Sequence, residues 1–253
     1  MSIKGIDVSK WQGNIDFEKV KAAGYEFVVI RCNNWDSSKN CVTKDPYFEQ
    51  NYARAKSAGL KVGAYYYTWQ STVLGAKEDV GLCLEYIKDK QFEYPVYYDL
   101  EWQKAFSQGR DVCSTMVETF CGNMEKAGYF VGLYISRSPL QCYITAEVAN
   151  KYALWIAEYG VSKPQYSGTY GMWQHTDNGS VPGVGENVDL DVSYVDYAKL
   201  ITEGGFNGFP KPAPAESAKP VESPKGDLNG DGKVDIEDVA ALVNHINGVK
   251  PLE

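Results

Sequence analysis

The sequence predicts an α/β fold: a modified (β/α) barrel with about five βα units and three final strands, followed by a small C-terminal EF-hand-like loop-helix segment. Two observations predict the barrel. A helix–glycine–strand unit recurs with a period near 35 residues, which is typical of parallel strands joined by helical crossovers. The expected strands are also nearly continuous apolar runs, as in a sheet that is buried on both faces. A doubly wound open sheet is the alternative, although no glycine-rich phosphate loop follows any strand.

Three glycines that each end a helix identify the recurring unit. Gly24, Gly59 and Gly128 lie 35 and then 69 residues apart, so one copy, near residue 93, lacks its glycine. Glycine tolerates the left-handed conformation in which helices commonly end. We therefore expect helices at about 16–24, 45–59, 75–90 and 112–128. Near three of their starts stand acidic residues suited to helix caps, namely Asp16, Asp45 and Asp111.

Eight strands are expected in all. The first is Ile3–Val8, and four more, at 25–31, 60–67, 94–102 and 129–135, belong to the recurring unit. After residue 136 the expected strands lie closer together in the sequence. Three follow with little helix between them, at 154–159, 171–176 and 188–192. If the barrel closes, the first and last strands become neighbours.

The composition divides the chain into three parts. Residues 1–204 hold all the barrel signals, and residues 205–225 are rich in Pro, Ala and Ser, as in a semi-extended linker. Residues 226–253 carry six acidic and two basic side chains, so this tail holds about half of the formal net charge of −8.

Charge and hydropathy exclude two classes of partner. A net charge of −8 leaves no basic face with which to neutralise phosphates, so we expect no nucleic acid partner. No run approaches the roughly 18–20 apolar residues that a membrane span needs. The first residues enter a strand at once and show no signal-peptide hydrophobic region.

Four carboxylates are expected at one end of the barrel. Asp99 and Glu101 are two residues apart at the end of a strand, so their side chains should point the same way. Two carboxyls that share a small volume cannot both ionise freely, and one keeps its proton toward neutral pH. Asp7 and Asp189 join them, because chemistry in such barrels occurs at the carboxyl ends of the strands. Any one alone fits an ordinary polar strand end, whereas four together favour catalysis.

Aromatic residues are expected at the same rim. Sugar rings present apolar faces with hydroxyl edges, which aromatic rings beside hydrogen-bonding groups suit. For each aromatic residue, packing in the barrel is the alternative. The set is Tyr65, Tyr67, Trp69, Trp102, Tyr134, Trp155 and Trp173.

Five motifs occur in order along residues 3–200. They are Gly5-Ile6-Asp7-Val8-Ser9-Lys10-Trp11-Gln12-Gly13, the strand Tyr97–Glu101, Leu154–Ala157, Trp173-Gln174 and Gly185–Leu190. Together they resemble the lysozymes of glycoside hydrolase family 25, the Chalaropsis-type muramidases. The resemblance implies cleavage of the β-1,4 bond between N-acetylmuramic acid and N-acetylglucosamine, without a cofactor. It also implies that Glu101 is the general acid, Asp99 its partner carboxylate, Asp7 and Asp189 supporting acids, and Gln174 a substrate contact.

Two routes remain open for Asp99. It attacks the anomeric carbon directly, or it orients the 2-acetamido group of the substrate, which then acts as the nucleophile. Direct attack needs the acid and the nucleophile on opposite sides of the bond. Carboxyls two residues apart on one strand lie on the same side, so we favour the acetamido route.

The tail has the spacing of a calcium loop. Oxygen ligands stand at loop positions 1, 3, 5, 9 and 12, with Gly232 at position 6 for the sharp turn and the Lys233 carbonyl at position 7. The side-chain ligands are Asp227, Asn229, Asp231, Asp235 and Asp238. A helix from Ile236 to Ile246 should follow, with an apolar face that includes Val239, Leu242 and Val243.

This tail resembles one repeat of a dockerin, the module that docks secreted enzymes onto cohesin domains of a scaffolding protein. A dockerin normally has two repeats, and this segment shows one. The resemblance implies a bound Ca²⁺, a cohesin-bearing partner and a secreted, extracellular protein. Peptidoglycan is the expected substrate. The rival hypotheses are a barrel that binds glycans without cleaving them and an assembly component that acts through its tail.

Overall fold

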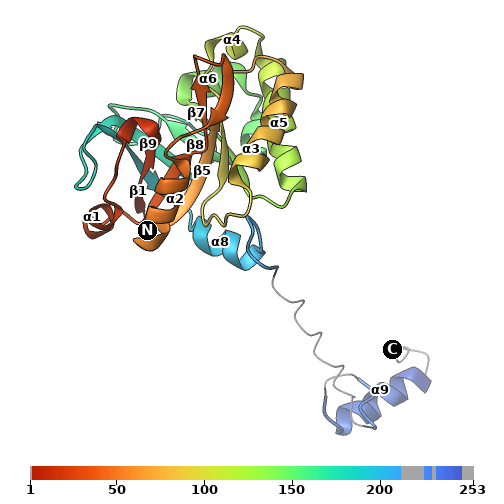
Figure 1. Cartoon of the computed structure of the whole chain (residues 1–253). Helices are drawn as coiled ribbons and strands as arrows, with labels where there is room; N and C mark the ends of the chain where they lie inside the picture. Colours follow the sequence, from red (N-terminus) through yellow and green to blue (C-terminus); the bar gives the residue numbers. More distant parts are fainter. Residues whose placement is uncertain (1, 212–224, 230–231, 247–253) are drawn as a thin grey trace. The chain divides into compact units, whose positions relative to one another are not determined.

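The structure is a computed structural model that describes residues 2–211, 225–229 and 232–246. The chain divides into two compact units, Met1–Lys211 and Pro212–Glu253, which are described separately (Figure 1). Among the described residues, no helix has both the length and the apolar character that a bilayer crossing demands.

The first unit is a closed eight-stranded barrel, which confirms the predicted fold class and rules out the open sheet. Its strands follow the order β1-β10-β9-β8-β7-β6-β5-β2. They are β1 (Ile3–Val8), β2 (Phe27–Arg31), β5 (Lys61–Tyr67), β6 (Val96–Asp99), β7 (Val131–Ser136), β8 (Ala153–Ala157), β9 (Met172–Gly179) and β10 (Val188–Ser193).

One strand runs against the others. Every neighbouring pair from β1 through β2, β5, β6, β7 and β8 to β9 is parallel, whereas β10 is antiparallel to both β9 and β1. The beginning of β10 therefore meets the carboxyl ends of the other strands. The expectation that Asp189 sits at the carboxyl end of its strand is wrong, because it is the second residue of β10. It reaches the expected rim only because β10 is reversed.

Five helical crossovers join the parallel strands from β1 to β8, as predicted. Figure 1 shows α3 and α5 packed side by side outside the sheet. The crossover helices are α1 (Phe17–Ala22), α2 (Phe48–Ser57), α3 (Val73–Ile87), α5 (Arg110–Lys126) and the pair α6 (Arg137–Tyr143) and α7 (Ala146–Lys151). Shorter elements complete the unit: η1 (Lys10–Gln12), α4 (Gln103–Phe106) and α8 (Tyr197–Gly204).

The predicted helix ends are confirmed by backbone conformation. Gly24, Gly59 and Gly128 all have positive φ, between 75° and 91°. In the copy that lacks a glycine, Asp89 takes this role after α3, with φ 60°. Of the expected caps, Asp16 accepts from the backbone N–H of Lys19 at the start of α1.

The other two acidic residues are not helix caps. Asp45 lies two residues before Tyr47, which is the cap of α2, and its carboxylate accepts from the backbone N–H of Tyr47 at 2.8 Å. Asp111 lies inside the first turn of α5, which begins after Gly109. Acidic residues near a helix start are favourable in either place, because they face unpaired backbone N–H groups.

Two apolar cores flank the strands. Tyr97 belongs to a cluster inside the barrel with Tyr65, Tyr134 and Trp155, whereas its neighbour Tyr98 belongs to the cluster beneath the helices. This alternation follows from the two-residue period of a strand. Inside the barrel, Gly132 makes room for Tyr97, because a Cβ at this glycine would lie 2.5 Å from the tyrosine ring.

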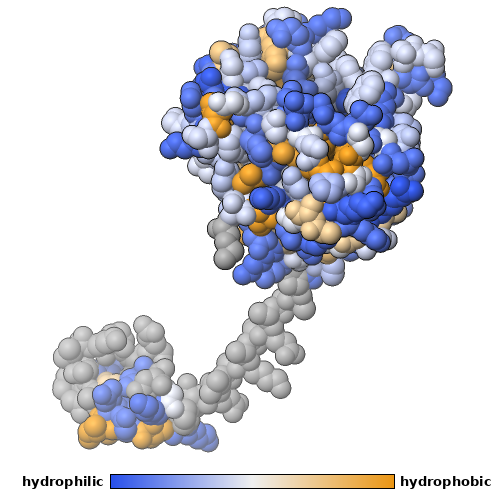
Figure 2. Space-filling view, turned by 90° about the vertical axis from the view of Figure 1, so that its left-hand side faces the viewer, coloured by the Kyte–Doolittle hydropathy of each residue, from blue (hydrophilic) through white to orange (hydrophobic). Residues whose placement is uncertain are grey.

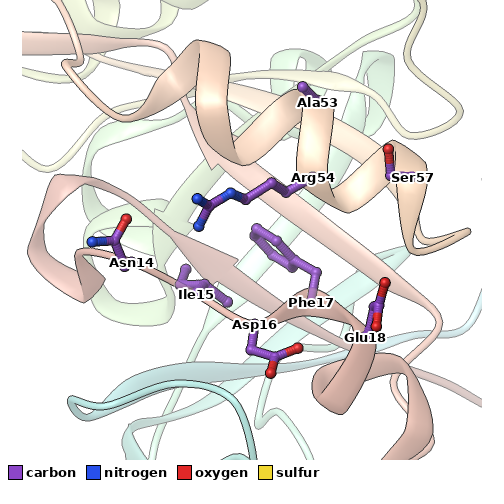
Figure 3. Close-up of a pocket in the computed structure, with 8 residues that line it drawn as sticks. All are labelled: Asn14, Ile15, Asp16, Phe17, Glu18, Ala53, Arg54 and Ser57. Atoms are coloured by element: carbon purple, nitrogen blue, oxygen red, sulfur yellow. The ribbon is translucent and has the colours of Figure 1, made fainter.

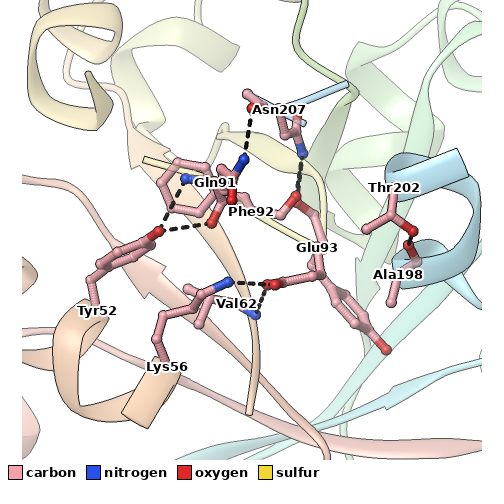
Figure 4. A network of polar contacts seen from close by, with 11 residues as sticks. Tyr52, Lys56, Val62, Gln91, Phe92, Glu93, Ala198, Thr202 and Asn207 are labelled. Atoms are coloured by element: carbon pink, nitrogen blue, oxygen red, sulfur yellow. Dashed lines mark hydrogen bonds and ion pairs between the residues drawn. The ribbon is translucent and has the colours of Figure 1, made fainter. Parts of the chain in front are cut away.

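The barrel unit extends seven residues beyond the predicted boundary at residue 204, so the expected start of the linker at 205 is wrong. Asn207 is fully buried, accepts from the backbone N–H of Phe130, and donates to the carbonyls of Phe92 and Tyr94 (Figure 4). Nearby, the Gln91 amide donates to the Gly208 carbonyl. These contacts join the segment to the barrel, which composition alone did not indicate. Residues 212–224 of the predicted linker lie outside the described residues.

A hairpin between β2 and α2 was not predicted. Its strands β3 (Asn33–Asp36) and β4 (Cys41–Lys44) pair with each other and form a sheet separate from the barrel. The sequence signal for it is poor, because these strands are polar and the turn contains Asn40, rather than glycine, at φ 51°.

The second unit contains the predicted helix α9 (Ile236–Ile246). Figure 2 shows apolar side chains gathered along one side of this unit. Ile236, Val239, Leu242 and Ile246 are all exposed. Val243, expected on the same face, lies in the helix, but its side chain is outside the described set.

Candidate active site

A pocket of about 100 Å³ opens at the carboxyl ends of the barrel strands. It contains all four predicted carboxylates and several of the predicted aromatics. Its lining is Asp7, Arg31, Tyr65, Tyr67, Asp99, Glu101, Tyr134, Trp155, Gln174 and Asp189. The strands that supply these residues lie far apart in sequence, so the site depends on closure of the barrel.

Asp99 is the last residue of β6, and Glu101 is the second residue after it. Asp99 is paired with Tyr67 of β5 and Tyr134 of β7, and its side chain is buried inside the barrel. Leu100 points to the outer core, which is the apolar cluster between the sheet and the helices. Its backbone N–H donates to the Tyr134 carbonyl at 3.1 Å, which continues the hydrogen bonding between β6 and β7. Glu101 therefore returns to the pocket side, where it is exposed at the rim. The i, i+2 reasoning predicted this arrangement correctly.

Asp7 and Asp189 meet because β1 and β10 are paired. The two residues are direct partners across this antiparallel pair. Asp191, which the sequence analysis missed, is also buried, and it accepts from Trp155 Nε1 at 2.9 Å. Its other carboxyl oxygen has no hydrogen-bond partner among the described residues. A signal was present, since Asp191 lies two residues after Asp189 on the same strand and so shares its side.

Gln174 joins the carboxylates to two tyrosines. Its Nε2 donates to Asp7 Oδ2 at 2.7 Å. Its Oε1 accepts from the hydroxyls of Tyr134 at 2.8 Å and Tyr159 at 2.5 Å. Both ends of this buried amide are paired, so its orientation is determined by its partners. Tyr159 is a further residue that the sequence analysis did not select.

The carboxyls share a medium that disfavours charge. Burial, and then the neighbouring acids, raise the pKa of Asp7, Asp99 and Asp191 well above the usual range. Burial raises the pKa of Asp189 to about 6. Although Glu101 is exposed at the rim, the protein that surrounds the pocket desolvates it and raises its pKa as well. The group thus retains protons at a pH where isolated carboxyls are ionised.

Arg31 is the cation of the pocket, and the sequence analysis missed it. It ends β2 and pairs with Tyr65 of β5. Its charge lowers the pKa of Asp99 and of Glu101, opposing burial. Its guanidinium lies 4.6 Å from the ring centre of Tyr67 and 5.1 Å from that of Trp69. A signal for it was its position at the carboxyl end of a strand, the criterion that selected the acids.

The predicted aromatics divide into two groups. Tyr65, Tyr67, Tyr134 and Trp155 line the pocket, together with Gln174. Trp69 lies beside Tyr67, with ring centres 4.7 Å apart.

The other two aromatics pack elsewhere. Trp102 packs against the outer core and lies beneath Lys104, and Trp173 belongs to the outer core and donates to the Glu158 carbonyl. Both follow or belong to barrel strands, but their side chains point to the outer side of the sheet. Neither is among the described residues that line the pocket.

A second hollow, of about 510 Å³, lies between α1 and α2 (Figure 3). It is larger than the carboxyl pocket, but its polar side chains do not form a catalytic set. Asp16 caps α1 and pairs with Lys19, and its pKa is lowered by that lysine. Arg54 enters from α2 and is exposed. The carboxyl pocket is therefore the better candidate for chemistry.

The C-terminal loop has a donor set that suits calcium. Asp227, Asn229, Asp235 and Asp238 are described, whereas Asp231 lies outside the described residues. Asp238 accepts from the backbone N–H groups of Leu228 and Asp235, both at 2.7 Å. Its carboxylate thus faces the loop, and Gly232 has φ 84° at the expected sharp turn. Hard oxygen ligands around a tight loop fit Ca²⁺.

Comparison with known proteins gives two family matches. The profile of Glycosyl hydrolases family 25 matches residues 6–184, which is more than half of the chain. The profile of the Dockerin type I domain matches residues 225–253.

Similar proteins are named as lysozymes. The chain is 30% identical to the autolytic lysozyme of Clostridium acetobutylicum over 203 residues, which is 80% of this chain and 58% of that protein. It thus spans less than two thirds of that relative. Lysozyme M1 of Streptomyces globisporus is 28% identical over 79% of this chain and 70% of its own length. The crystal structure of the bacterial lysozyme from Streptomyces coelicolor matches with a TM-score of 0.64 and 26% identity, covering 78% of this chain and 94% of that one.

Proposed function

Because this chain belongs to glycosyl hydrolase family 25, we propose that it is a lysozyme that hydrolyses the β-1,4 bond between N-acetylmuramic acid and N-acetylglucosamine in bacterial peptidoglycan. The observation that carries the proposal is the convergence of four carboxyl side chains, Asp7, Asp99, Glu101 and Asp189, on one pocket. Glycosidic cleavage needs a proton donor and a second carboxyl group near the same sugar ring.

Glu101 is the proposed general acid. It lies at the exposed rim, where a glycosidic oxygen has access, and its raised pKa keeps a larger fraction protonated near neutral pH. Protonation of the leaving oxygen allows the bond to break without expelling an alkoxide.

Asp99 is proposed to stabilise the positive charge that develops as the bond breaks. It lies deeper than Glu101, and burial raises its pKa well above the usual range. Positive charge on the sugar or on its acetamido group favours the ionised form of a nearby carboxyl group. The attraction between the Asp99 carboxylate and this charge is therefore strongest as the charge forms. Asp99 and Glu101 point to the same side from one strand. This placement supports the acetamido route over direct attack by Asp99.

Asp7 and Asp189 are proposed to support this pair. Neither projects from β6, and Gln174 orients Asp7 through a hydrogen bond of 2.7 Å. Coulombic repulsion from Asp189 contributes to the raised pKa of both Asp99 and Glu101. The substrate-binding assignments of Tyr65, Tyr67, Tyr134, Trp155 and Gln174 remain proposals, supported by their place in the pocket lining. That of Trp69 is supported by its ring contact with Tyr67, whereas the assignment of Trp102 is not kept, because its side chain packs on the outer side of the sheet.

The tail is proposed to act as a calcium-dependent attachment segment that docks a cohesin-bearing scaffold, in a secreted protein. Its match to the dockerin profile supports this role. Asp227, Asn229, Asp231, Asp235, Asp238 and the Lys233 carbonyl would hold the ion. Bound Ca²⁺ would neutralise these carboxylates and rigidify the loop.

The assignment is tested with purified cell walls. Glu101→Gln should abolish clearing of a peptidoglycan suspension, and Asp99→Asn should nearly do so, while circular dichroism shows an unchanged fold. Glu85→Gln, an exposed acid on α3, is the matched control and should clear walls at the wild-type rate. Wall binding by wild type without clearing would favour the glycan-binding alternative. Undiminished clearing by Glu101→Gln would remove Glu101 from the mechanism.

A further inference from the structure

We propose that Trp35, at the β3–β4 hairpin, and Trp69 form a sugar-binding platform outside the carboxyl pocket. The platform would hold a ring of the glycan chain beyond the two rings that flank the cleaved bond. The proposal rests on the proposed function, because it extends the same binding site. It also gives a role to the hairpin, which lies outside the barrel sheet.

The aromatic rings form a continuous row that starts in the pocket. Tyr67 lines the pocket, and its ring centre is 4.7 Å from that of Trp69. The Trp69 ring centre is in turn 5.7 Å from that of Trp35. Each pair is tilted by 49°. The row therefore leads from the catalytic carboxyls to the hairpin without a break.

The row is open to a ligand. Trp35 is 37% exposed, so part of it remains accessible to a ligand although its ring contacts that of Trp69. Tyr67 and Trp69 are half-buried. An aromatic residue that only fastened the hairpin to the barrel would be expected to bury its ring, as Trp155 does in the barrel interior.

A pair of hydrogen bonds between the Asn33 side chain and the Tyr67 backbone joins the two segments that carry the row. Asn33 is fully buried, and its side chain donates to the Tyr67 carbonyl at 2.8 Å and accepts from the Tyr67 N–H at 3.0 Å. Trp35 and Trp69 each lie two residues further along from this pair. The contact between Asn33 and Tyr67 thus lies next to the contact between the Trp35 and Trp69 rings.

Arg31 supports the row from the pocket side. Its guanidinium lies over Tyr67 and Trp69 at 4.6 and 5.1 Å, so it pairs with rings that continue toward the hairpin. A cation over a ring face restricts the tilt of that ring. Trp69 is therefore held in place before a ligand arrives, which reduces the entropy lost on binding.

The chemistry of the row suits a pyranose rather than a peptide chain. A sugar ring offers an apolar C–H face of the size of an indole, and the row is continuous with a pocket proposed to bind sugars. The stem peptide of peptidoglycan would need backbone pairing or charge complementarity instead. Loss of an aromatic contact of this kind weakens binding about three- to tenfold.

The experiment compares uncrosslinked glycan strands of several defined lengths as substrates for the full chain. Wild-type kcat/KM should rise with strand length, and Trp35→Ala should lose about three- to tenfold on long strands while retaining the wild-type value on the shortest cleaved strand. The loss should appear in KM rather than in kcat, because the platform does not touch the reacting atoms. Trp35→Phe should restore most of the affinity.

Tyr194→Ala is the matched control. Tyr194 is 43% exposed and contacts Tyr170 edge to face, but it follows β10 at the opposite end of the barrel from the pocket. It should leave the length dependence unchanged. Thermal unfolding of each variant separates a lost platform from a lost fold.

Binding of N-acetylglucosamine oligomers, measured by calorimetry, distinguishes failure of this inference from failure of the proposed function. Cleavage of peptidoglycan by wild type with equal length dependence in Trp35→Ala would overturn the platform and leave the function intact. If wild type does not cleave peptidoglycan but binds the oligomers, and Trp35→Ala weakens this binding, the proposed function would be overturned and the platform would stand. Absence of both binding and cleavage would overturn both.

Discussion

Gln174 Nε2 donates to Asp7 Oδ2 at 2.7 Å, and this hydrogen bond connects β9 to β1 across the intervening strand β10. The amide oxygen of Gln174 accepts from Tyr134 and Tyr159. One buried amide therefore determines the position of an acid in the pocket and of two hydroxyl groups.

Replacing Gln174 should disturb both stability and activity. Gln174→Ala removes the hydrogen bond to the Asp7 carboxyl and the amide oxygen that accepts from the buried Tyr134 hydroxyl, so we expect a loss of about 2 kcal/mol in the free energy of unfolding. Urea denaturation measures this loss, and wall clearing should fall as Asp7 moves. Gln50→Ala is the control, since the Gln50 amide makes an exposed hydrogen bond to Asn14. A Gln174→Ala protein as stable as this control would contradict the role assigned to the amide.

Arg31 should set the alkaline limit of activity. Its charge lowers the pKa of Asp99 and Glu101, so its removal raises both values. The general acid then keeps its proton to higher pH, and the alkaline limb of the kcat/KM profile for Arg31→Gln should move upward. Arg31→Lys retains the charge and should leave the limb nearly in place. Arg54→Gln, in the hollow between α1 and α2, is the control. Identical profiles for wild type and Arg31→Gln would refute the electrostatic role.

The buried acids should make the barrel less stable as pH rises from about 4 to 6. Asp189 has a pKa of about 6 in the fold against a usual value of 3.8. The folded state therefore binds more protons than the unfolded chain in this window, and the free energy of unfolding decreases with rising pH. Asp7, Asp99 and Asp191 act in the same direction.

Calorimetry should thus give a higher Tm at pH 5 than at pH 7.5. Asp189→Asn should reduce the difference. The exposed Asp36, whose pKa is lowered to about 2, acts only below the usual range and so does not mask the trend. A Tm that rises between pH 5 and 7.5 would show that the acids are not desolvated as described.

Asn207 should stabilise the barrel although it lies beyond the last predicted strand. Asn207→Ala removes three hydrogen bonds to backbone groups of Phe92, Tyr94 and Phe130. Because these groups are largely buried, we expect a loss of about 2–3 kcal/mol in chemical denaturation. Asn14→Ala, at an exposed position, should change the midpoint little. Truncation after residue 204 should destabilise the unit as well, whereas truncation after residue 211 should leave its stability unchanged.

Calcium should bind to the tail without changing the chemistry of the barrel. All residues that line the carboxyl pocket lie within Met1–Lys211, so EDTA should leave the rate of wall clearing unaltered. Calorimetry of the full chain should detect Ca²⁺ uptake at about millimolar concentration or below. Asp227→Ala should weaken uptake about tenfold or more, and Glu237→Ala, outside the ligand positions, should not. An EDTA-sensitive clearing rate would show that the two units are coupled.

The sequence by itself determined the class of fold and most of the candidate pocket. Glycines at helix ends indicate local backbone conformation, and apolar runs indicate buried strands. Both patterns depend only on residues that are close together in the sequence, so the sequence alone reveals them. The two-residue period of a strand placed Asp99 and Glu101 on one side. The same logic, applied to the position two residues after Asp189, would have found Asp191.

Only the tertiary structure decided what depends on strand direction and on contacts between distant segments. The reversal of β10 brings the start of that strand to the rim, and no local pattern encodes this direction. Arg31, Tyr159 and the hairpin with Trp35 became part of the site because barrel closure and the Asn33–Tyr67 contact bring them there. Trp102 and Trp173 point away from the pocket, because their side chains pack against the apolar cluster on the outer side of the sheet. Side-chain direction at the end of a strand is decided by packing against neighbouring elements, which a single sequence does not display.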